Sequence, residues 1–354
     1  MKGLILSGGK GTRLRPLTHT AAKQLVPVAN KPILFYGIEA LRKAGITEVG
    51  IVVGDTWKEI QDTLGDGSAF DIKISYIRQE EPLGLAHAVL TARPYLGNDR
   101  FVMFLGDNLI KNGIASQVQA FRDESPNSQI LLARVPRPQE FGVAEIEGGK
   151  VVRLTEKPQD PKSDLALVGV YMFDENIFRA AENIKPSWRN ELEITDAIQW
   201  LIDAGLDVRW REIDGWWKDT GKLDDMLEAN RIILGDLERN IGGEVDAESR
   251  LDGPVVVGKG ARVVKSMLRG PCIIGENCLI EESYVGPFTS IYYEVEIVRS
   301  EIEHSIVLER SVIRDSGARI ESSLLGKDVR IERAPGVPRA MRFMVGDSSR
   351  IEIL

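Results

Sequence analysis

Residues 2–13 have the sequence KGLILSGGKGTR, and this stretch decides how the fold begins. The apolar run Lys2–Ser7 is typical of a buried strand, and it passes directly into a loop with three glycines and Arg13. In open α/β sheets, ligands bind just beyond the carboxyl ends of the strands. The stretch therefore predicts a strand that leads into a ligand-binding loop.

Strand and helix patterns alternate along the rest of the first half of the chain. This alternation predicts an α/β fold with a Rossmann-like, mostly parallel sheet that has helices on both faces. The predicted strands cover residues 49–53, 73–78, 101–105, 130–135 and 166–173, and helical spacing covers residues 31–44, 85–93 and 223–240.

A different pattern begins after the polar, glycine-containing stretch at residues 241–252. Helical spacing ends, and β-branched or leucine residues recur every five or six positions, which is typical of the hexapeptide repeats of a parallel β-helix. A β-sandwich with coincidental spacing is the alternative. The repeating positions are Val257, Val263, Leu268, Ile274, Ile280, Val285, Ile291 and Ile297.

The pattern divides the chain at residue 240. Residues 1–240 are predicted to form the ligand-binding domain, and residues 241–354 the β-helix with a C-terminal cap. We expect the cap to use the apolar side chains of the tail, because the end of a solenoid needs covering. These side chains are Phe343, Met344, Val345 and Ile351.

Composition excludes several classes of protein. The 354 residues include 45 Lys and Arg against 53 Asp and Glu, a net charge of −8, which does not favour binding to duplex nucleic acid. Cys272 and Cys278 are too few for a disulfide framework, and the three histidines are too scattered in sequence to indicate a metal cluster. Neither a membrane-spanning run nor a signal peptide is evident, so we predict a cytoplasmic location without membrane or nucleic-acid partners.

The glycine-rich loop is suited to phosphate. Gly8, Gly9 and Gly11 allow the backbone to approach a phosphate closely, and the Arg13 guanidinium can bind phosphate oxygens with two hydrogen bonds. Leu14 stands where the third glycine of a dinucleotide-binding loop would be, which argues against a dehydrogenase, and no Gly-Lys-Ser/Thr of a P-loop occurs here.

Two motifs together give the chain a family resemblance. The loop Gly8–Arg13 is followed by the sequence KQLVPVANKP at residues 23–32. This pair of motifs resembles that of the sugar-phosphate nucleotidyltransferases, and most closely the glucose-1-phosphate thymidylyltransferases in their long form, which adds a C-terminal left-handed β-helix.

The resemblance implies a reaction and its chemistry. A sugar 1-phosphate attacks the α-phosphorus of a nucleoside triphosphate in line, which releases pyrophosphate; in the long form, dTTP and glucose 1-phosphate give dTDP-glucose, the first step of dTDP-deoxysugar synthesis. Positioning and electrostatics dominate catalysis of this kind. The resemblance assigns catalysis to Arg13, Lys23, Asp107 and Lys157, with Arg13 stabilising the leaving pyrophosphate.

Further residues are assigned to the nucleotide. A glutamine both donates and accepts hydrogen bonds, so Gln79 can bind the imide edge of thymine or uracil, and Gly84 allows the backbone close to the base. The Gln79 contact does not distinguish the two bases, so UTP remains an alternative to dTTP. The full expected nucleotide set is Leu6, Gly8, Gly9, Gly11, Thr12, Arg13, Lys23, Gln24, Gln79, Pro82, Gly84 and Asp107.

Asp107 and Asp219 each end an apolar or aromatic run, in the sequences LGDN and WKDTG. Two such carboxylates suit a Mg²⁺ ion that is held by few protein ligands and by substrate phosphates, and the resemblance makes them its ligands. On the sugar side, the resemblance implies that Glu156 accepts hydrogen bonds from hydroxyl groups and that Lys157 pairs with the sugar phosphate. The expected sugar-phosphate set is Asn108, Phe141, Gly142, Glu156, Lys157, Tyr171 and Trp217.

Two other functions were weighed. A non-catalytic regulatory relative that binds sugar nucleotides is disfavoured because all five charged site residues are present: Arg13, Lys23, Asp107, Lys157 and Asp219. Acetyl transfer by the β-helix is disfavoured because His304 is the one histidine in the repeats. The remaining histidines, His19 and His87, are interpreted as structural. The stacked coils lead us to expect a homo-oligomer.

Overall fold

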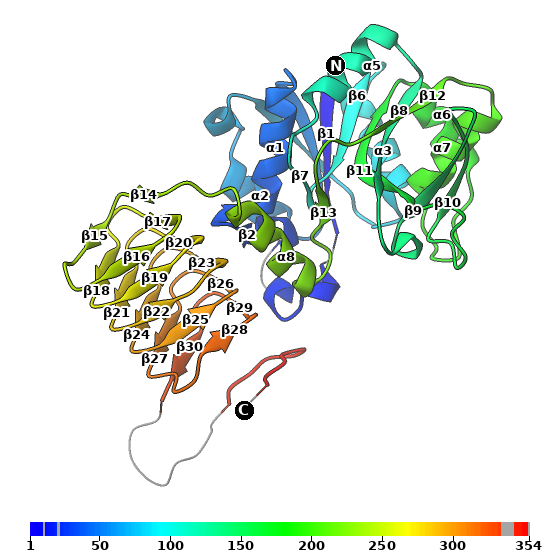
Figure 1. The fold of residues 1–354 in the computed structure, drawn as a ribbon. Coiled ribbons are helices and arrows are strands. Elements are labelled where there is room, and N and C mark those ends of the chain that lie inside the picture. The colour runs from blue at the N-terminus through cyan, green and yellow to red at the C-terminus, as the bar shows by residue number, and fades with distance from the viewer. Residues whose placement is uncertain (10, 20–21, 334–342, 353–354) are drawn as a thin grey trace. The chain divides into compact units, whose positions relative to one another are not determined.

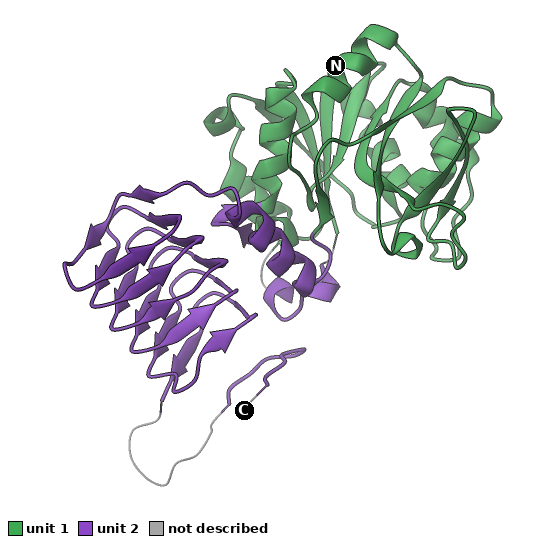
Figure 2. Cartoon of the chain, in the orientation of Figure 1, with its two compact units in different colours: residues 1–10, 21–25, 33–219 green, residues 11–20, 26–32, 220–354 purple. Residues whose placement is uncertain are grey.

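The computed structural model describes residues 1–9, 11–19, 22–333 and 343–352. The chain forms two compact units (Figure 2): residues 1–10, 21–25 and 33–219 make the first, and residues 11–20, 26–32 and 220–354 the second. Among the described residues, no helix is long and apolar enough to cross a membrane.

A mixed nine-stranded sheet forms the centre of the first unit (Figure 1). Its main path runs β10-β9-β11-β6-β1-β4-β5, and β8 pairs with β11 and β12. Strand β1 is parallel to β4 on one side and to β6 on the other, so the strand order reverses at β1. The strands are β1 (Lys2–Ser7), β4 (Glu48–Val53), β5 (Lys73–Arg78), β6 (Phe101–Leu105), β8 (Ser128–Arg134), β9 (Gly142–Glu147), β10 (Lys150–Glu156), β11 (Leu165–Phe173) and β12 (Val208–Glu212).

Helices cover both faces of this sheet, because successive strand residues point to opposite sides. Leu4 and Leu6 of β1 pack in one apolar cluster with α3, α6 and α7, whereas Ile5 packs in a second cluster with α1, α2 and α5. The helices are α1 (Ile33–Lys43), α2 (Trp57–Leu64), α3 (Leu85–Thr91), α4 (Arg93–Leu96), α5 (Ala115–Glu124), α6 (Asn176–Asn183) and α7 (Ile194–Asp203).

The predicted strands of the first half are confirmed, but the sequence analysis missed the β9–β10 hairpin. Charged residues interrupt the apolar pattern of both strands, which hides them from a search for buried runs. The turn itself carried the signal: Gly148 and Gly149 have φ values of 57° and 81°, as a tight hairpin turn requires.

Parallel strands in three stacked sheets form most of the second unit, as expected for a left-handed β-helix (Figure 1). One sheet stacks β14 (Asn240–Ile241), β17 (Val255–Val257), β20 (Cys272–Ile274), β23 (Thr289–Ile291), β26 (Ile306–Val307) and β29 (Leu324–Leu325). The next stacks β15 (Glu244–Val245), β18 (Arg262–Val264), β21 (Leu279–Glu281), β24 (Glu296–Val298), β27 (Val312–Arg314) and β30 (Arg330–Glu332). The third stacks β16 (Arg250–Asp252), β19 (Met267–Arg269), β22 (Tyr284–Val285), β25 (Glu301–Glu303) and β28 (Ile320–Glu321).

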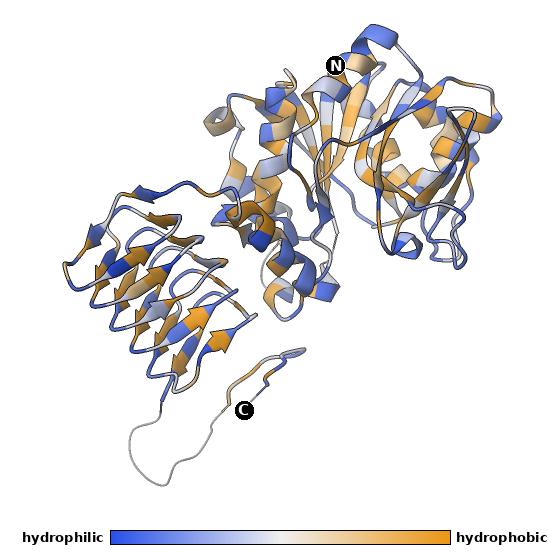
Figure 3. Ribbon diagram, viewed as in Figure 1, coloured by the Kyte–Doolittle hydropathy of each residue, from blue (hydrophilic) through white to orange (hydrophobic). Residues whose placement is uncertain are grey.

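The repeating apolar residues form the core of these coils. All eight positions identified in the sequence are buried there, and the strand register stacks Val257, Ile274 and Ile291 in one column. Hydropathy alternates along the strands accordingly (Figure 3). The parallel sheets contradict the β-sandwich alternative, whose sheets are antiparallel.

A ladder of serines lines one corner of the coils. The backbone N–H of Ser283 donates to the Ser266 hydroxyl at 3.0 Å, and the N–H of Ser300 donates to the Ser283 hydroxyl at 3.2 Å. The residue before each serine, such as Glu282 or Arg299, has a positive φ of about 46° to 47° that turns the corner. The ladder satisfies buried backbone donors where the strands are interrupted.

Helix α8 (Leu223–Leu234) belongs to the second compact unit, together with residues 26–32, while the domain boundary expected at residue 240 stays a prediction. Asn230 is buried on α8 and bonds in two directions. Its Oδ1 accepts from the backbone N–H of Ala29 at 2.8 Å and from the Ser290 hydroxyl at 2.7 Å. Strands β2 (Pro27–Val28) and β3 (Lys31–Pro32) therefore lie with α8.

The expected C-terminal cap stays a prediction. Its four apolar side chains, Phe343, Met344, Val345 and Ile351, are exposed. The described tail contains no helix or strand.

Candidate active site

The site begins where β1, β4 and β5 end side by side. A Cβ at Gly54 would lie 2.8 Å from the carbonyl oxygen of Gly8, and a Cβ at Gly8 would lie 3.3 Å from Oε1 of Gln79. Because both positions are glycine, the ends of β1 and β4 can lie close to each other and to the Gln79 amide. The predicted loop residue Gly8 and the predicted base-binding residue Gln79 are thus neighbours.

A buried ion pair lies at the neighbouring end of β6. The Lys23 ammonium group lies 2.5 Å from Oδ2 of Asp107, and the Asn108 amide donates to Oδ1 at 2.9 Å. Burial alone would raise the pKa of Asp107, but the Lys23 charge and these hydrogen bonds outweigh it and lower that pKa below its usual value. Asp107 therefore stays ionised.

The two carboxylates expected to bind metal are brought close together. Asp219 ends β13 (Trp217–Asp219), which pairs antiparallel with β7 (Asn108–Ile110), and the register sets Asp219 opposite Asn108. Asp219 is thus opposite the residue that follows Asp107. Oxygen donors from two such carboxylates fit a hard divalent cation that keeps its other positions for water and phosphate.

The same pair of strands positions an aromatic wall. The indole N–H of Trp217 donates to the Asn108 side-chain oxygen at 2.5 Å, and the Trp217 ring contacts the Phe141 ring edge-on, with centroids 5.1 Å apart. Three residues expected on the sugar side, Asn108, Phe141 and Trp217, therefore form one contact group.

The loop expected to bind the base is held from two sides. Nε2 of Gln79 lies 2.9 Å from Nδ1 of His87 on α3, so His87 fixes the orientation of the amide. Gly84 has a φ of 107°, and a Cβ there would lie 2.5 Å from the carbonyl oxygen of Leu192. The backbone of Leu192 also bonds to Leu83 at 2.7 Å, so only glycine fits at position 84.

Strands β9 and β10 bring the other sugar residues together. Gly142 pairs with Glu156, and a Cβ at Gly142 would lie 3.2 Å from Oε2 of Glu156. The Thr195 hydroxyl donates to Oε2 of Glu156 at 2.7 Å. The other carboxylate oxygen, Oε1, faces the cationic side chains of Lys157 and Arg189. The Lys157 ammonium group lies 3.8 Å from Oε1, and the Lys157 backbone has a left-handed φ of 43°.

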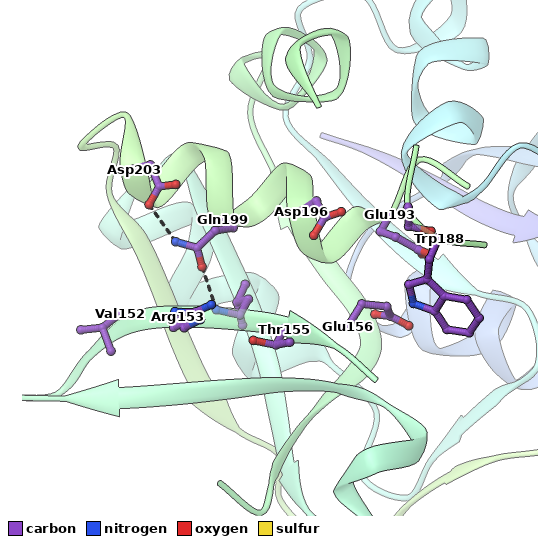
Figure 4. Close-up of a pocket in the computed structure, with 11 residues that line it drawn as sticks. Val152, Arg153, Thr155, Glu156, Trp188, Glu193, Asp196, Gln199 and Asp203 are labelled. Atoms are coloured by element: carbon purple, nitrogen blue, oxygen red, sulfur yellow. Dashed lines mark hydrogen bonds between the residues drawn. The ribbon is translucent and has the colours of Figure 1, made fainter. Parts of the chain in front are cut away.

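Glu156 also lines a cavity of about 650 Å³ between β10 and α7 (Figure 4). Burial and the charge of Glu156 raise the pKa of both Glu193 and Asp196. An acidic cavity of this kind suits a ligand that offers hydroxyl groups. The lining residues are Val152, Arg153, Leu154, Thr155, Glu156, Ser187, Trp188, Glu193, Asp196, Gln199 and Asp203.

The loop before α7 closes one end of this cavity. Trp188 lies beside Glu156 in Figure 4, and its side chain is 85% exposed. The neighbouring Arg189 guanidinium lies 2.9 Å from Glu191 and 3.5 Å from Glu193. Helix α7 begins at Ile194, directly after Glu193.

Other expected nucleotide residues fall into two groups. In the first unit, Leu6 and Gln24 are buried, Gly9 and Pro82 are exposed, and Oε1 of Gln24 has no hydrogen-bond partner among the described residues. In the second unit, Thr12 and Arg13 are exposed in a short 3-10 helix (Thr12–Leu14) that follows Gly11, whose φ is 61°. Their position toward the first unit stays a prediction.

Tyr171 is more deeply placed than its expected sugar contact implies. Its ring is 4% exposed and packs in the apolar core against Phe173, with centroids 6.0 Å apart. Burial, assisted by the charge of Glu156, raises the pKa of the hydroxyl.

The sequence analysis missed three residues. His87 was interpreted as structural but contacts Gln79, and Trp188 and Arg189 were not identified at all. A tryptophan beside an arginine in the polar loop PSWRNE at residues 186–191 is the signal that could have found them. No such signal marks His87, since its contact with Gln79 depends on the packing of α3.

A mixed sheet with a glycine-rich loop at its switch point and an acidic cavity beside it is the arrangement expected of a transferase that joins a nucleotide to a second substrate. The family profile described as nucleotidyl transferase matches residues 2–235. The chain belongs to the nucleotidyl transferase family.

Named relatives agree with this family over the whole chain. A glucose-1-phosphate thymidylyltransferase of Streptomyces griseus is 56% identical over 100% of this chain and 99% of the relative. A low-salt glycan biosynthesis nucleotidyltransferase of Haloferax volcanii is 45% identical over 100% of both chains.

Solved structures match the first part of the chain. A Bacillus anthracis protein named as a glucose-1-phosphate thymidylyltransferase is 35% identical with a TM-score of 0.63, and the match covers 68% of this chain and 97% of that one. A UDP-glucose pyrophosphorylase in complex with UDP-glucose is 26% identical with a TM-score of 0.60, over 66% and 98% of the two chains.

Proposed function

We propose that this enzyme is a glucose-1-phosphate thymidylyltransferase, which converts dTTP and α-D-glucose 1-phosphate to dTDP-glucose and pyrophosphate. The observation that carries the proposal is the 56% identity, over the full chain, to thymidylyltransferases of Streptomyces griseus and Streptomyces antibioticus. The buried Lys23–Asp107 pair and the acidic cavity supply a chemical basis for it.

The triphosphate binds at the ends of β1 and β6. Backbone N–H groups of residues 8–11 surround its phosphates, Lys23 neutralises them, and Arg13 stabilises the pyrophosphate that leaves. Gln79, oriented by His87, binds the imide edge of the base, while Gly84 leaves room for the ring. Charge that develops on the α-phosphate therefore meets cations already in place.

The sugar phosphate binds toward β9 and β10. Glu156 accepts hydrogen bonds from sugar hydroxyls, and Lys157 pairs with the phosphate and aims its oxygen at the α-phosphorus. No proton has to be removed from this nucleophile at neutral pH, so placement of two polyanions is the main task. Trp217 and Phe141 form an apolar wall that excludes water from that side.

Asp107 and Asp219 are the residues that would hold Mg²⁺. Asp107 is ionised, and the β7–β13 register sets Asp219 opposite its neighbour, so the donors fit the ion. When bound there, the ion would supply positive charge that neutralises the phosphates.

The test is pyrophosphate release with glucose 1-phosphate and Mg²⁺, comparing dTTP and UTP. We expect dTTP to give the higher kcat/KM. Preference for UTP would replace the proposal by a uridylyltransferase that uses the same site. Nucleotide binding without turnover by any nucleoside triphosphate would indicate a regulatory relative instead.

A further inference from the structure

A cluster of possible metal ligands lies on the β-helix, far along the chain from the residues discussed so far. It consists of Glu303 at the end of β25, His304 directly after it, and Glu321 at the end of β28. One ligand atom from each residue lies within 4.8 Å of the other two. We propose that these three side chains bind a divalent transition-metal cation, with Zn²⁺ and Ni²⁺ as representatives.

Coil stacking creates the cluster. The parallel pairing of β25 with β28 sets Glu303 beside Glu321, on consecutive coils of the same sheet. Two carboxylates side by side repel each other and destabilise a sheet unless a cation lies between them. The histidine joins them because it occupies the corner that follows β25, with a left-handed φ of 48°.

The local charge is complementary to a dication. Arg319 bonds to Glu303 at 3.2 Å and to Glu301 at 2.9 Å, so one guanidinium serves these two carboxylates, and Glu321 adds a third. A carboxylate that gives one oxygen to arginine keeps lone pairs for a metal ion. Three carboxylates and one guanidinium leave a net charge of −2, which one divalent cation would neutralise.

The partly buried imidazole of His304 supplies the nitrogen donor of the cluster. Nδ1 of His304 is buried and has no hydrogen-bond partner among the described residues. A buried nitrogen without a partner is unfavourable and requires an explanation, since most such groups are satisfied. The ring is held in place by Phe288, whose centroid is 5.4 Å away, so it is positioned before any ligand arrives.

A glycine makes room for one of the carboxylates. Gly286 precedes Glu303 in the same column of the sheet, and a Cβ at Gly286 would lie 2.7 Å from Oε2 of Glu303. Glu303 can therefore fold its carboxylate over the preceding coil while Glu321 lies on the following one.

The donor set selects the kind of metal. One imidazole and two carboxylates match the ligands of Zn²⁺ and Ni²⁺, whereas Mg²⁺ and Ca²⁺ prefer oxygen ligands throughout. Three protein ligands leave further positions for water. Because the ligands come from consecutive coils, the bound ion would tie together the C-terminal end of the β-helix.

The experiment is a Zn²⁺ titration of the full-length, tag-free chain by calorimetry, after chelation and in saturating Mg²⁺. We expect about one equivalent of Zn²⁺ to bind and the melting temperature to rise. His304→Ala and Glu321→Gln should each weaken binding at least about tenfold, as loss of a ligand does. His19→Ala is the matched histidine control and should change nothing.

Two further variants keep the result interpretable. Asp107→Asn should bind Zn²⁺ on the β-helix unchanged, which separates this site from the proposed Mg²⁺ site. Nucleotidyl transfer with Mg²⁺ should persist in His304→Ala and Glu321→Gln, which shows that they fold. Absence of Zn²⁺ binding by the parent chain, or equal binding by His304→Ala and Glu321→Gln, would overturn the proposal.

Discussion

Lys23 and Asp107 in the first unit form a single buried ion pair between different elements, whereas Ser266, Ser283 and Ser300 in the second unit repeat one hydrogen bond from coil to coil. The ion pair joins two residues that lie far apart in the sequence and belong to different elements. The serine ladder is a repeat, and each member stabilises only its own corner. The ion pair of the first unit belongs to the proposed catalytic site, whereas the serines of the second unit stabilise the corners of the coils.

The largest effect is expected for Asp107→Asn. It removes a proposed metal ligand and the negative charge that faces the Lys23 ammonium group, so kcat should fall at least about 10²-fold. Pyrophosphate release measures it. Asp71→Asn, on an exposed carboxylate that pairs with Arg42, is the control and should keep full activity. Equal activity of the two variants would show that the Asp107 carboxylate is not needed for catalysis.

The next effect concerns the backbone of the base-binding loop. Gly84→Ala would force a Cβ against the backbone of Leu192, so we expect the free energy of unfolding to fall by about 2–4 kcal/mol. Gly205→Ala is the matched control, because its φ of 75° is also positive but no atom lies within 4 Å of the added Cβ. It should cost about 1 kcal/mol. Denaturant unfolding compares them, and similar losses would show that strain, not contact, requires glycine at position 84.

A smaller effect is expected from His87→Ala. Without its partner the Gln79 amide is less well oriented, so KM for the nucleotide should rise about two- to tenfold while kcat stays constant. Steady-state kinetics measure both constants. Gln79→Ala and the double variant complete the cycle, and the two losses should not add. Additive losses would mean that His87 acts independently of Gln79.

The smallest effect is expected from the ladder. Ser283→Ala removes a donor to the Glu281 carbonyl and the acceptor for the Ser300 N–H, so stability should fall by about 1–2 kcal/mol with unchanged activity. Thermal unfolding followed by circular dichroism tests this. Ser316→Ala, at the exposed end of the ladder, should cost less. A loss of activity in Ser283→Ala would show that the coils affect catalysis.

The contrast also explains what could be predicted from sequence. The β-helix core was predictable residue by residue, because every coil repeats the same burial pattern. The positions of Gly8 and Asp107 at strand ends were also predictable, because each follows an apolar run that is typical of a buried strand. His87 and Glu321 were not, because their partners are set by the packing of α3 and by coil register.

The expectation for the C-terminal tail rested on its hydrophobic residues alone. Apolar residues at positions 343–345 suggested a cap, yet hydrophobicity alone does not say which surface a segment covers, and these side chains are exposed. The antiparallel hairpin β9–β10 was missed because one of its faces is polar. Its Gly148-Gly149 turn was the visible clue.

The side chain of Asn230 bears on how the chain can be shortened. It joins α8 to Ala29 and to Ser290, and Asn30 adds a bond from its amide to the carbonyl of Ile291 at 2.6 Å. Residues 26–32 follow Lys23 closely in sequence, so deleting the coils would remove hydrogen-bond partners from the segment that continues the phosphate-binding region. Removing the β-helix would therefore leave the side chains of Asn30 and Asn230 without their partners in the coils, and a truncated enzyme would need replacements at positions 30 and 230.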